Sequence, residues 1–541
     1  MQQTVAVLGG GVAGLSAAHE LAERGFQVRV YERKSMLGGK ARSIAVPDSG
    51  VNGRQPLPGE HGFRFFPGFY QHVTDTMRRI PYSAHGNTFD NLTAATRMLL
   101  ARAGQTEITW VARCPSTPDD LRAFLIELLT PFGVPPDELA YFVSRLLIVA
   151  TSCPERRLKE FENIAWWDFI GAQQRSAAYR AYLGQGMTRS LVAMRAEESS
   201  TRTVGNIQLQ LLYCLISPDR VFDRLLAGPT NDVWIYPWTQ YLEKLGVEFH
   251  RDSRMVEIQT DGAKCTGATV ESGGGRSQVT ADYYVAAMPV EVMATLMTAP
   301  LKQAAPSLAK LDKLKTRWMN GIQFYLSKDA PLVNGHVIYL DSPWALTSIS
   351  QRQFWTNVDL TQYGDGTVRG ILSVDISDWE APGVVFGKPA RECSAVEIKD
   401  EVWAQLQQHL NDSGESPLVD SQLVSWFLDP DIEFPNPGSA TNAEPLLINT
   451  AGSLQYRPEA QVELKNFFVA SDYVKTYTDL ACMEAANEAA RRAVNCLLVA
   501  AGSSAAPARL WPLEEPAFLK PIQEIDRIRF GLGLPNHLAS M

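Results

Sequence analysis

Residues 5–43 read VAVLGGGVAGLSAAHELAERGFQVRVYERKSMLGGKARS, and this stretch decides the fold. The apolar run at 4–8 predicts a β-strand, apolar residues at helical spacing over 15–22 predict a helix, and 27–31 predict a second strand that ends in Glu32. A glycine-rich turn joins the first strand to the helix. This order is typical of a βαβ unit that binds a dinucleotide.

The turn carries the pattern Gly-x-Gly-x-x-Gly at Gly9, Gly11 and Gly14. The first glycine permits the tight turn, the second lets a pyrophosphate approach the backbone, and the third lets the helix pack closely on the sheet. The helix N-terminus at Val12 and Ala13 offers unpaired N–H groups and the positive end of its dipole to the phosphates. Such glycines alone often mark only a tight turn, so the prediction depends on the strand and helix around them.

The acid Glu32 is placed to accept hydrogen bonds from a ribose 2′-OH, and its charge would repel a 2′-phosphate. The sequence therefore favours FAD or NAD over NADP. The run 32–43 that follows resembles the Arg-x-x-x-x-Gly-Gly-x-x-Arg/Ser extension of the amine oxidase and phytoene desaturase superfamily of flavoproteins, which implies that the cofactor is FAD. The residues that this resemblance assigns to the cofactor are Arg33, Gly38, Gly39, Lys40 and Arg42.

A second resemblance lies in Glu60-His61-Gly62-Phe63-Arg64, which is similar to the Glu-His-Gly segment of plant and cyanobacterial phytoene and ζ-carotene desaturases. In that family the turn runs beside the isoalloxazine ring. The resemblance implies that Gly62, Phe63 and Arg64 contact the flavin, and that His61, Arg64 and Glu60 are the catalytic candidates. The alternative is an aromatic core turn after a proline-rich loop, because aromatic residues are often simply core.

Near the C-terminal end, an apolar strand at 467–470 leads through Asp472 into a helix expected over 480–498 that contains Met483. This resembles the closing motif of the family, in which the Asp bonds the ribityl chain and the helix N-terminus points at the flavin pyrimidine. The resemblance also implies that a backbone group near Val256 meets the adenine.

The predicted fold class is α/β, with a Rossmann-type (GR2-like) FAD-binding domain interleaved with an α+β substrate domain of mixed sheet and helices. Helices are expected at 119–129, 137–150 and 395–410, and strands at 321–326 and 371–375. Any one of these helices is more often ordinary core than a tunnel wall. The predicted FAD-binding domain comprises 1–80, 225–300 and 440–500, and the predicted substrate domain comprises 81–224 and 301–439. Residues 501–541 form a C-terminal tail, and the default expectation is that it packs across the body of the protein.

Composition narrows the class of protein. The 541 residues carry a net charge of −9, which argues against a nucleic-acid binder. The seven cysteines form no Cys-x-x-Cys and the eight histidines show no ligand spacing, so reduced thiols and no metal are predicted. We expect no signal peptide and no transmembrane segment, hence a cytoplasmic protein that at most makes peripheral contact with a membrane.

The resemblance implies an FAD-dependent oxidoreductase that transfers hydride at flavin N5 to or from a large hydrophobic polyene or isoprenoid. The resembled branch includes desaturases, hydroxysqualene dehydroxylases and enzymes that reductively cyclise polyene macrolactams, and desaturation and reductive cyclisation both stay open. NAD(P)H, oxygen or a quinone would be a transient electron partner, since only one nucleotide pattern is present. The alternatives are an amine or amino-acid oxidase, in which Tyr473 and Tyr477 imitate an aromatic cage, and a flavoprotein that holds FAD only structurally.

Overall fold

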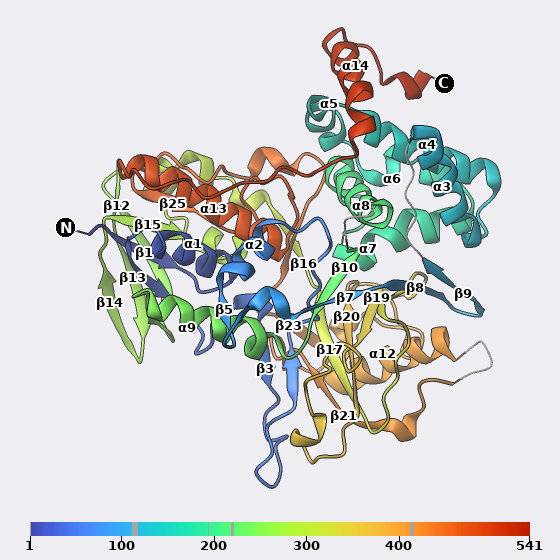
Figure 1. The fold of residues 1–541 in the computed structure, drawn as a ribbon, viewed down its shortest axis with the longest axis horizontal. Coiled ribbons are helices and arrows are strands. Elements are labelled where there is room, and N and C mark those ends of the chain that lie inside the picture. The colour runs from blue at the N-terminus through green and yellow to red at the C-terminus, as the bar shows by residue number, and fades with distance from the viewer. Residues whose placement is uncertain (1, 111–116, 193, 218–220, 412–415, 541) are drawn as a thin grey trace.

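The computed structural model describes residues 2–110, 117–192, 194–217, 221–411 and 416–540. Figure 1 shows two sheets with a group of helices above the second: a parallel sheet at the left, a mixed sheet at the lower right, and helices at the upper right. The predicted α/β class, with a Rossmann-type sheet beside a mixed sheet, is confirmed.

The parallel sheet has the strand order β11-β2-β1-β15-β25. Its middle strand is almost fully buried, because strands covered on both faces must be apolar throughout. The strands are β1 (Thr4–Leu8), β2 (Gln27–Tyr31), β11 (Glu248–His250), β15 (Tyr283–Ala286) and β25 (Phe467–Val469). They come from all three segments predicted to form the FAD-binding domain, and every pairing between them is parallel.

Two helices pack lengthwise against each other beside this sheet: α1 (Val12–Ala22) and α13 (Met483–Ala500). The side chain of Asn487 donates to Ser16 Oγ over 2.8 Å between them. A three-stranded antiparallel sheet of β12 (Arg254–Thr260), β13 (Cys265–Ser272) and β14 (Gly275–Val279) completes this part, and the turn of Gly273 and Gly274 joins its last two strands as a hairpin.

The mixed sheet has the strand order β21-β17-β20-β19-β18-β8-β9. Among the described strands of this sheet, the β18–β8 pairing is parallel and the other pairings are antiparallel. Helix α12 (Ala395–Leu410) covers one face, where Ile398 and Val402 join a core with Phe324 and Val374. The strands are β8 (Arg97–Arg102), β9 (Gln105–Trp110), β17 (Asn320–Leu326), β18 (Gly335–Tyr339), β19 (Leu346–Ser350), β20 (Gly370–Ile376) and β21 (Leu423–Leu428).

The opposite face of the mixed sheet lies under a group of helices that includes α3 (Pro118–Leu129), α4 (Pro136–Thr151) and α8 (Thr201–Ile216). The first two match the predicted 119–129 and 137–150 within a residue at each end. Proline at their first positions fixes the backbone where a helix needs no N–H donor. The structure thus places an apolar helical layer over one face of the sheet.

One predicted boundary was wrong: α13 begins at Met483, whereas the sequence pattern placed the start at residue 480. The preceding loop is fixed in a non-helical conformation by Asp479, which has φ of 50° and whose buried carboxylate accepts hydrogen bonds from Arg202 and Arg457. Cys482 is extended and caps the helix. The helix therefore begins only where this loop ends.

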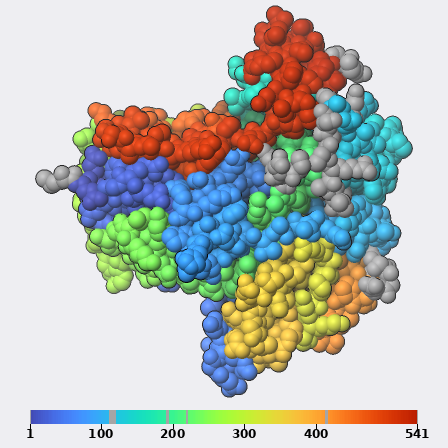
Figure 2. Space-filling model, viewed as in Figure 1, coloured from blue at the N-terminus to red at the C-terminus, as the bar shows by residue number. Residues whose placement is uncertain are grey.

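The C-terminal tail packs across the body, as its default predicted. Figure 2 shows this segment in red along the upper surface. Helix α14 (Lys520–Gly531) docks on α4 and on α5 (Pro154–Lys159) through Asp526, which is fully buried 3.0 Å from the Arg156 guanidinium. No helix in the described ranges has both the length and the apolar character needed to cross a bilayer.

Candidate active site

A cavity of about 300 Å³ lies where four strands of the parallel sheet end. Its lining includes Gly9 after β1, Glu32 after β2, Ala287 after β15 and Asp472 after β25. Ligands of open parallel sheets bind at the carboxyl ends of the strands, so this is the expected place for a nucleotide. The mixed sheet contributes the far wall through Asp375 of β20.

Two glycine-rich turns, at residues 9–14 and 38–39, line or adjoin the cavity, and we call them the glycine cradle. Their glycines are required for different physical reasons. A Cβ on Gly9, at φ of 118°, would lie 2.8 Å from the carbonyl oxygen of Ala287, and one on Gly14 would lie 1.8 Å from that of Gly9. Gly39 approaches Gly11 so closely that its Cβ would lie 2.9 Å from the Gly11 Cα. Gly11 differs, because its own Cβ would meet only the Gly39 Cα at 3.6 Å, an ordinary contact distance. At Gly11 the free space belongs to the cavity.

Glu32 joins the two glycine turns. Its carboxylate accepts hydrogen bonds from the backbone N–H of Gly10 over 2.8 Å and of Lys34 over 2.9 Å. Burial outweighs these bonds and raises the pKa of the carboxyl. Glu32 also lines the cavity, and its role toward a ribose stays a prediction.

The basic residues predicted from the glycine-rich extension have different positions. Arg33 and Lys40 line the cavity. Arg42 is buried behind it, where its guanidinium lies 2.5 Å from Asp431 and 2.9 Å from Glu444. Its charge is therefore balanced within the protein. Burial alone would raise the pKa of Glu444, but Arg42 and its other cationic neighbours hold that pKa well below the usual range.

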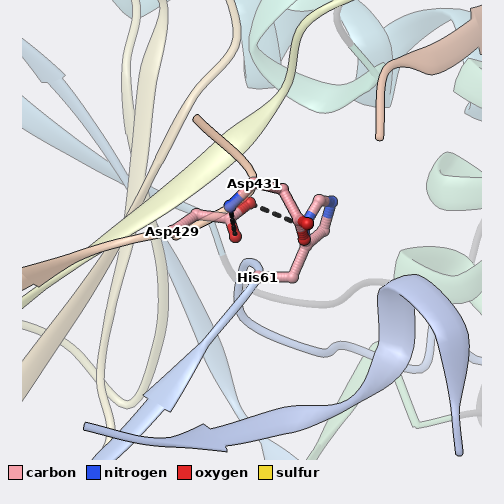
Figure 3. Close-up of side chains that lie close together, drawn as sticks. All are labelled: His61, Asp429 and Asp431. Atoms are coloured by element: carbon pink, nitrogen blue, oxygen red, sulfur yellow. Dashed lines mark hydrogen bonds and ion pairs between the residues drawn. The ribbon is translucent and has the colours of Figure 1, made fainter. Parts of the chain in front are cut away.

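Figure 3 shows a cluster formed by His61, Asp429 and Asp431. All three residues are buried, and His61 also lines the cavity. His61 Nδ1 lies 2.6 Å from Asp429 Oδ2 and 3.9 Å from Asp431 Oδ2. These groups could in principle hold a metal ion, since their ligand atoms lie within 4.8 Å of one another. Both carboxylates already have partners within the protein. Asp431 forms ion pairs with Lys34 and Arg42, and Asp429 accepts a hydrogen bond from Asn320. The two acids are therefore already engaged in ion pairs and a hydrogen bond within the protein, and the Asp429 carboxylate lies against His61 Nδ1.

The His61 turn brings a residue to the cavity that sequence reasoning missed. A Cβ on Gly62 would lie 2.6 Å from Asp375 Oδ1, so Gly62 lets the turn approach Asp375. Asp375 is buried and lines the cavity, and its Oδ1 has no hydrogen-bond partner among the described residues. Burial raises its pKa to about 7, against the opposing charge of Arg64. The signal in the sequence is weak: an acid at the end of a mostly apolar predicted strand, 371–375.

The opposite end of the cavity is built around α13. Asp472, Cys482 and Met483 line it, and the helix N-terminus faces it. Glu484 anchors this helix, because its carboxylate accepts from the backbone N–H groups of His72 and Val73 at the start of α2 (His72–Arg79). A helix N-terminus favours negative charge nearby, which suits one end of a flavin ring.

Most of the predicted site residues meet at this one cavity. Within the described part of the chain, the predicted residues outside its lining are Gly14, Arg42, Glu60 and Val256. Glu60 is buried, and its carboxylate accepts from the hydroxyl and backbone N–H of Thr230. The predicted residues in the lining are Gly9, Gly11, Val12, Ala13, Glu32, Arg33, Gly38, Gly39, Lys40, His61, Gly62, Phe63, Arg64, Asp472 and Met483. The glycine cradle and the two helix N-termini fit a dinucleotide such as FAD.

Two smaller apolar cavities follow the cofactor cavity on the side of the helices, and neighbouring cavities share lining residues. The middle cavity shares Phe63, Phe65 and Met319 with the cofactor cavity. The inner cavity, between α3, α4 and α8, shares four lining residues with the middle one, including Leu211 and Ile338. We call this series the apolar passage, because aliphatic and aromatic side chains make up most of its walls.

Comparisons with known proteins agree with this geometry. The family model described as flavin containing amine oxidoreductase matches residues 12–498. The ζ-carotene desaturase of Synechocystis is 22% identical over 522 residues, covering 91% of this chain and 97% of that protein. The 15-cis-phytoene desaturase of Synechococcus elongatus is 24% identical over 503 residues, covering 89% and 93%.

Among solved structures, the cyclohexylamine oxidase of Brevibacterium oxydans aligns with a TM-score of 0.59 at 12% identity, covering 93% of this chain and 99% of that one. A putrescine oxidase bound to putrescine aligns with a TM-score of 0.58 at 14% identity, with the same coverage. These structures share the fold of this chain.

Proposed function

The chain belongs to the family of flavin-containing amine oxidoreductases, and from that premise we propose that it is an FAD-dependent oxidoreductase acting on a large hydrophobic polyene- or isoprenoid-type substrate. The chain is a flavin oxidoreductase distantly related to carotenoid desaturases. Its substrate and the identity of the flavin as FAD are the parts that we propose.

The observation that carries the proposal is the apolar passage. Its cavities lie one after another: the middle cavity shares Phe63 and Phe65 with the cofactor cavity, and it shares Leu211 and Ile338 with the inner cavity between the helices. A small polar amine needs no such space, whereas a long polyene must bury its chain away from water. Ligand sites of this kind are apolar with a few placed polar groups.

Bound FAD would supply the hydride acceptor or donor. The chain's own contribution is to hold the polyene in the cavity, to exclude water, and to exchange with the substrate the proton that accompanies the hydride. Asp375 is the group best placed for that proton, since it is buried in the cavity wall with a pKa near neutrality. It gives up the proton when the substrate is reduced and takes it when the substrate is oxidised. His61 and Arg64, which also line the cavity, stay predicted catalytic residues.

The alternative function as an amine oxidase predicted that Tyr473 and Tyr477 form an aromatic cage. Tyr473 is fully buried, and within the described residues it is outside the cavity lining. Tyr477 is 44% exposed and lies over the guanidinium of Arg492. The two rings therefore do not face a common substrate space.

Blocking the passage tests the proposal. Leu211→Trp replaces an aliphatic side chain by a bulkier indole ring between the middle and inner cavities. Turnover of phytoene or ζ-carotene should therefore fall about tenfold or more, while flavin content stays unchanged. Leu158→Trp is the matched control, because Leu158 is 47% exposed on α5.

The measurement is anaerobic stopped-flow at the flavin absorbance band, with NAD(P)H, amines and polyenes in separate series. Loss of the band with NAD(P)H would indicate a reductase or reductive cyclase, and loss with a polyene a desaturase. Bleaching by amines alone, equal in wild type and Leu211→Trp, would contradict the proposal.

A further inference from the structure

The middle cavity contains polar atoms that its apolar walls leave without partners. Its lining includes His336 of β18 and Thr347 of β19. His336 is 7% exposed and Thr347 is 3% exposed. Among the residues that the structure describes, neither His336 Nε2 nor Thr347 Oγ1 has a hydrogen-bond partner. Two buried polar atoms in one small cavity therefore have unused hydrogen-bonding capacity.

The His336 ring is held in place from its other side. Its Nδ1 lies 2.8 Å from Asp223 Oδ2, and the second oxygen of Asp223 accepts from the backbone N–H of Phe66 over 3.1 Å. The ring also packs against Phe63 and Phe65, at centroid distances of 5.3 Å and 4.8 Å. The carboxylate thus faces Nδ1, and Nε2 is the ring nitrogen left without a hydrogen-bond partner among the described residues.

Thr347 is paired in the sheet between a residue of the cofactor cavity and a residue of the two smaller cavities. In the sheet its neighbours are Asp375 on β20 and Ile338 on β18. Residues paired across strands in this way point to the same face. The face opposite α12 thus carries polar side chains from Asp375 at the cofactor cavity to Thr347 and His336 in the middle cavity.

A pure hydrocarbon cannot satisfy these atoms, because it offers neither donor nor acceptor, and burying polar groups unpaired is unfavourable. A substrate hydroxyl can donate to Nε2 of the neutral imidazole and accept from the threonine hydroxyl, whereas a carbonyl oxygen can accept from the threonine hydroxyl and from the Nε2–H of an imidazolium. We propose that the middle cavity binds a hydroxyl or carbonyl oxygen of the substrate, so that this enzyme prefers an oxygenated polyene to a hydrocarbon one. The proposal rests on the proposed function and narrows its substrate class.

The test compares three ligands of one carbon skeleton on the flavin-loaded protein: all-trans-retinol, all-trans-retinal and axerophthene, the hydrocarbon that lacks the oxygen. Binding is followed by quenching of tryptophan fluorescence. Wild type should bind retinol or retinal at least about tenfold more tightly than axerophthene, since a site that leaves its polar groups unpaired rejects the analogue. The alcohol and the aldehyde distinguish a hydroxyl from a carbonyl ligand.

Thr347→Val should reduce that preference to within about threefold without weakening axerophthene binding, because valine keeps the shape and removes only the hydroxyl. Since this hydroxyl has no partner within the described residues, the variant should also melt at the same temperature as wild type or higher. Thr88→Val is the matched control: its buried hydroxyl donates to the Met77 carbonyl over 3.0 Å, so it should lose stability and keep the preference.

His336→Phe provides a second variant with the same expected loss of preference. Equal affinity of wild type for all three ligands would overturn this inference while leaving the apolar passage supported. Failure of all three to bind would overturn both this inference and the proposed function. An unchanged preference in Thr347→Val and His336→Phe would assign the discrimination to another part of the passage and would also overturn the inference.

Discussion

Replacing Asp375 by Asn is expected to lower turnover by about 100-fold or more and to leave flavin content unchanged, because removing a positioned acid or base typically costs 10²–10⁴-fold. The substitution keeps the size of the side chain and removes its proton exchange. Asp375 is buried in the cavity wall, where Gly62 lets the His61 turn pass beside it. Single-turnover kinetics at the flavin absorbance band measures the effect directly.

The pH dependence gives a second readout of Asp375. Burial raises its pKa to about 7, so the carboxyl is neutral below that pH and ionised above it. If the substrate is reduced, the carboxyl must donate, and turnover falls as the pH rises through 7. If the substrate is oxidised, the carboxylate must accept, and turnover rises through the same range. Asp375→Asn should remove this limb of the profile.

Stability should change with pH in a direction set by the same group. The folded-state pKa is raised above the ordinary value of 3.8, so the protonated carboxyl favours the folded protein, most fully below pH 4. That contribution declines as the pH rises from about 4 to about 7. Asp375→Asn should remove it from the pH dependence of the free energy of unfolding.

Asp329→Asn is the control, because burial also raises the pKa of Asp329 but, in the described chain, it is outside the cavity lining. Equal turnover in wild type and Asp375→Asn, with the same pH profile, would exclude Asp375 as the proton-exchanging group.

The features that could be predicted from the sequence involve residues close together in the chain, and the features that were missed join residues far apart in the chain. The glycine cradle was predictable because Gly9, Gly11 and Gly14 act within one βαβ unit, whose local order has a known physical reason. Helices such as α3 and α4 were predictable from apolar spacing and proline positions. These signals are local.

Asp375, Thr347 and His336 come to one face of the mixed sheet through strand pairing, because Thr347 is paired with Asp375 and with Ile338, which is two residues from His336. In sequence they are polar residues in apolar strands, which describes many satisfied core positions. The His61–Asp429 contact joins residues 368 positions apart for the same reason. Sequence reasoning found the glycine turns of the large cavity and missed the polar residues that the mixed sheet contributes to the cavities.

Gly11→Ala is expected to give a folded protein that has lost most of its flavin, with an affinity for FAD lowered by about 10- to 100-fold, which corresponds to about 1–3 kcal/mol of steric strain. The protein itself has room for the methyl group: Gly11 has φ of −77°, and the new Cβ would meet only the Gly39 Cα at 3.6 Å. The group that the methyl would obstruct is a pyrophosphate approaching the backbone from the cavity.

The contrast with Gly14 makes this prediction sharp. A Cβ on Gly14 would lie 1.8 Å from the Gly9 carbonyl oxygen, so Gly14→Ala should damage the fold whether or not a cofactor binds. Gly275→Ala, whose Cβ would meet a hairpin carbonyl at 3.9 Å, should change neither the fold nor the affinity for FAD.

Far-UV circular dichroism reports folding, and titration of apoprotein with FAD reports affinity. Wild-type FAD affinity in folded Gly11→Ala would mean that no phosphate lies against Gly11. Loss of FAD without loss of fold would place the pyrophosphate there, because steric exclusion by one methyl group acts only on a ligand in contact with it.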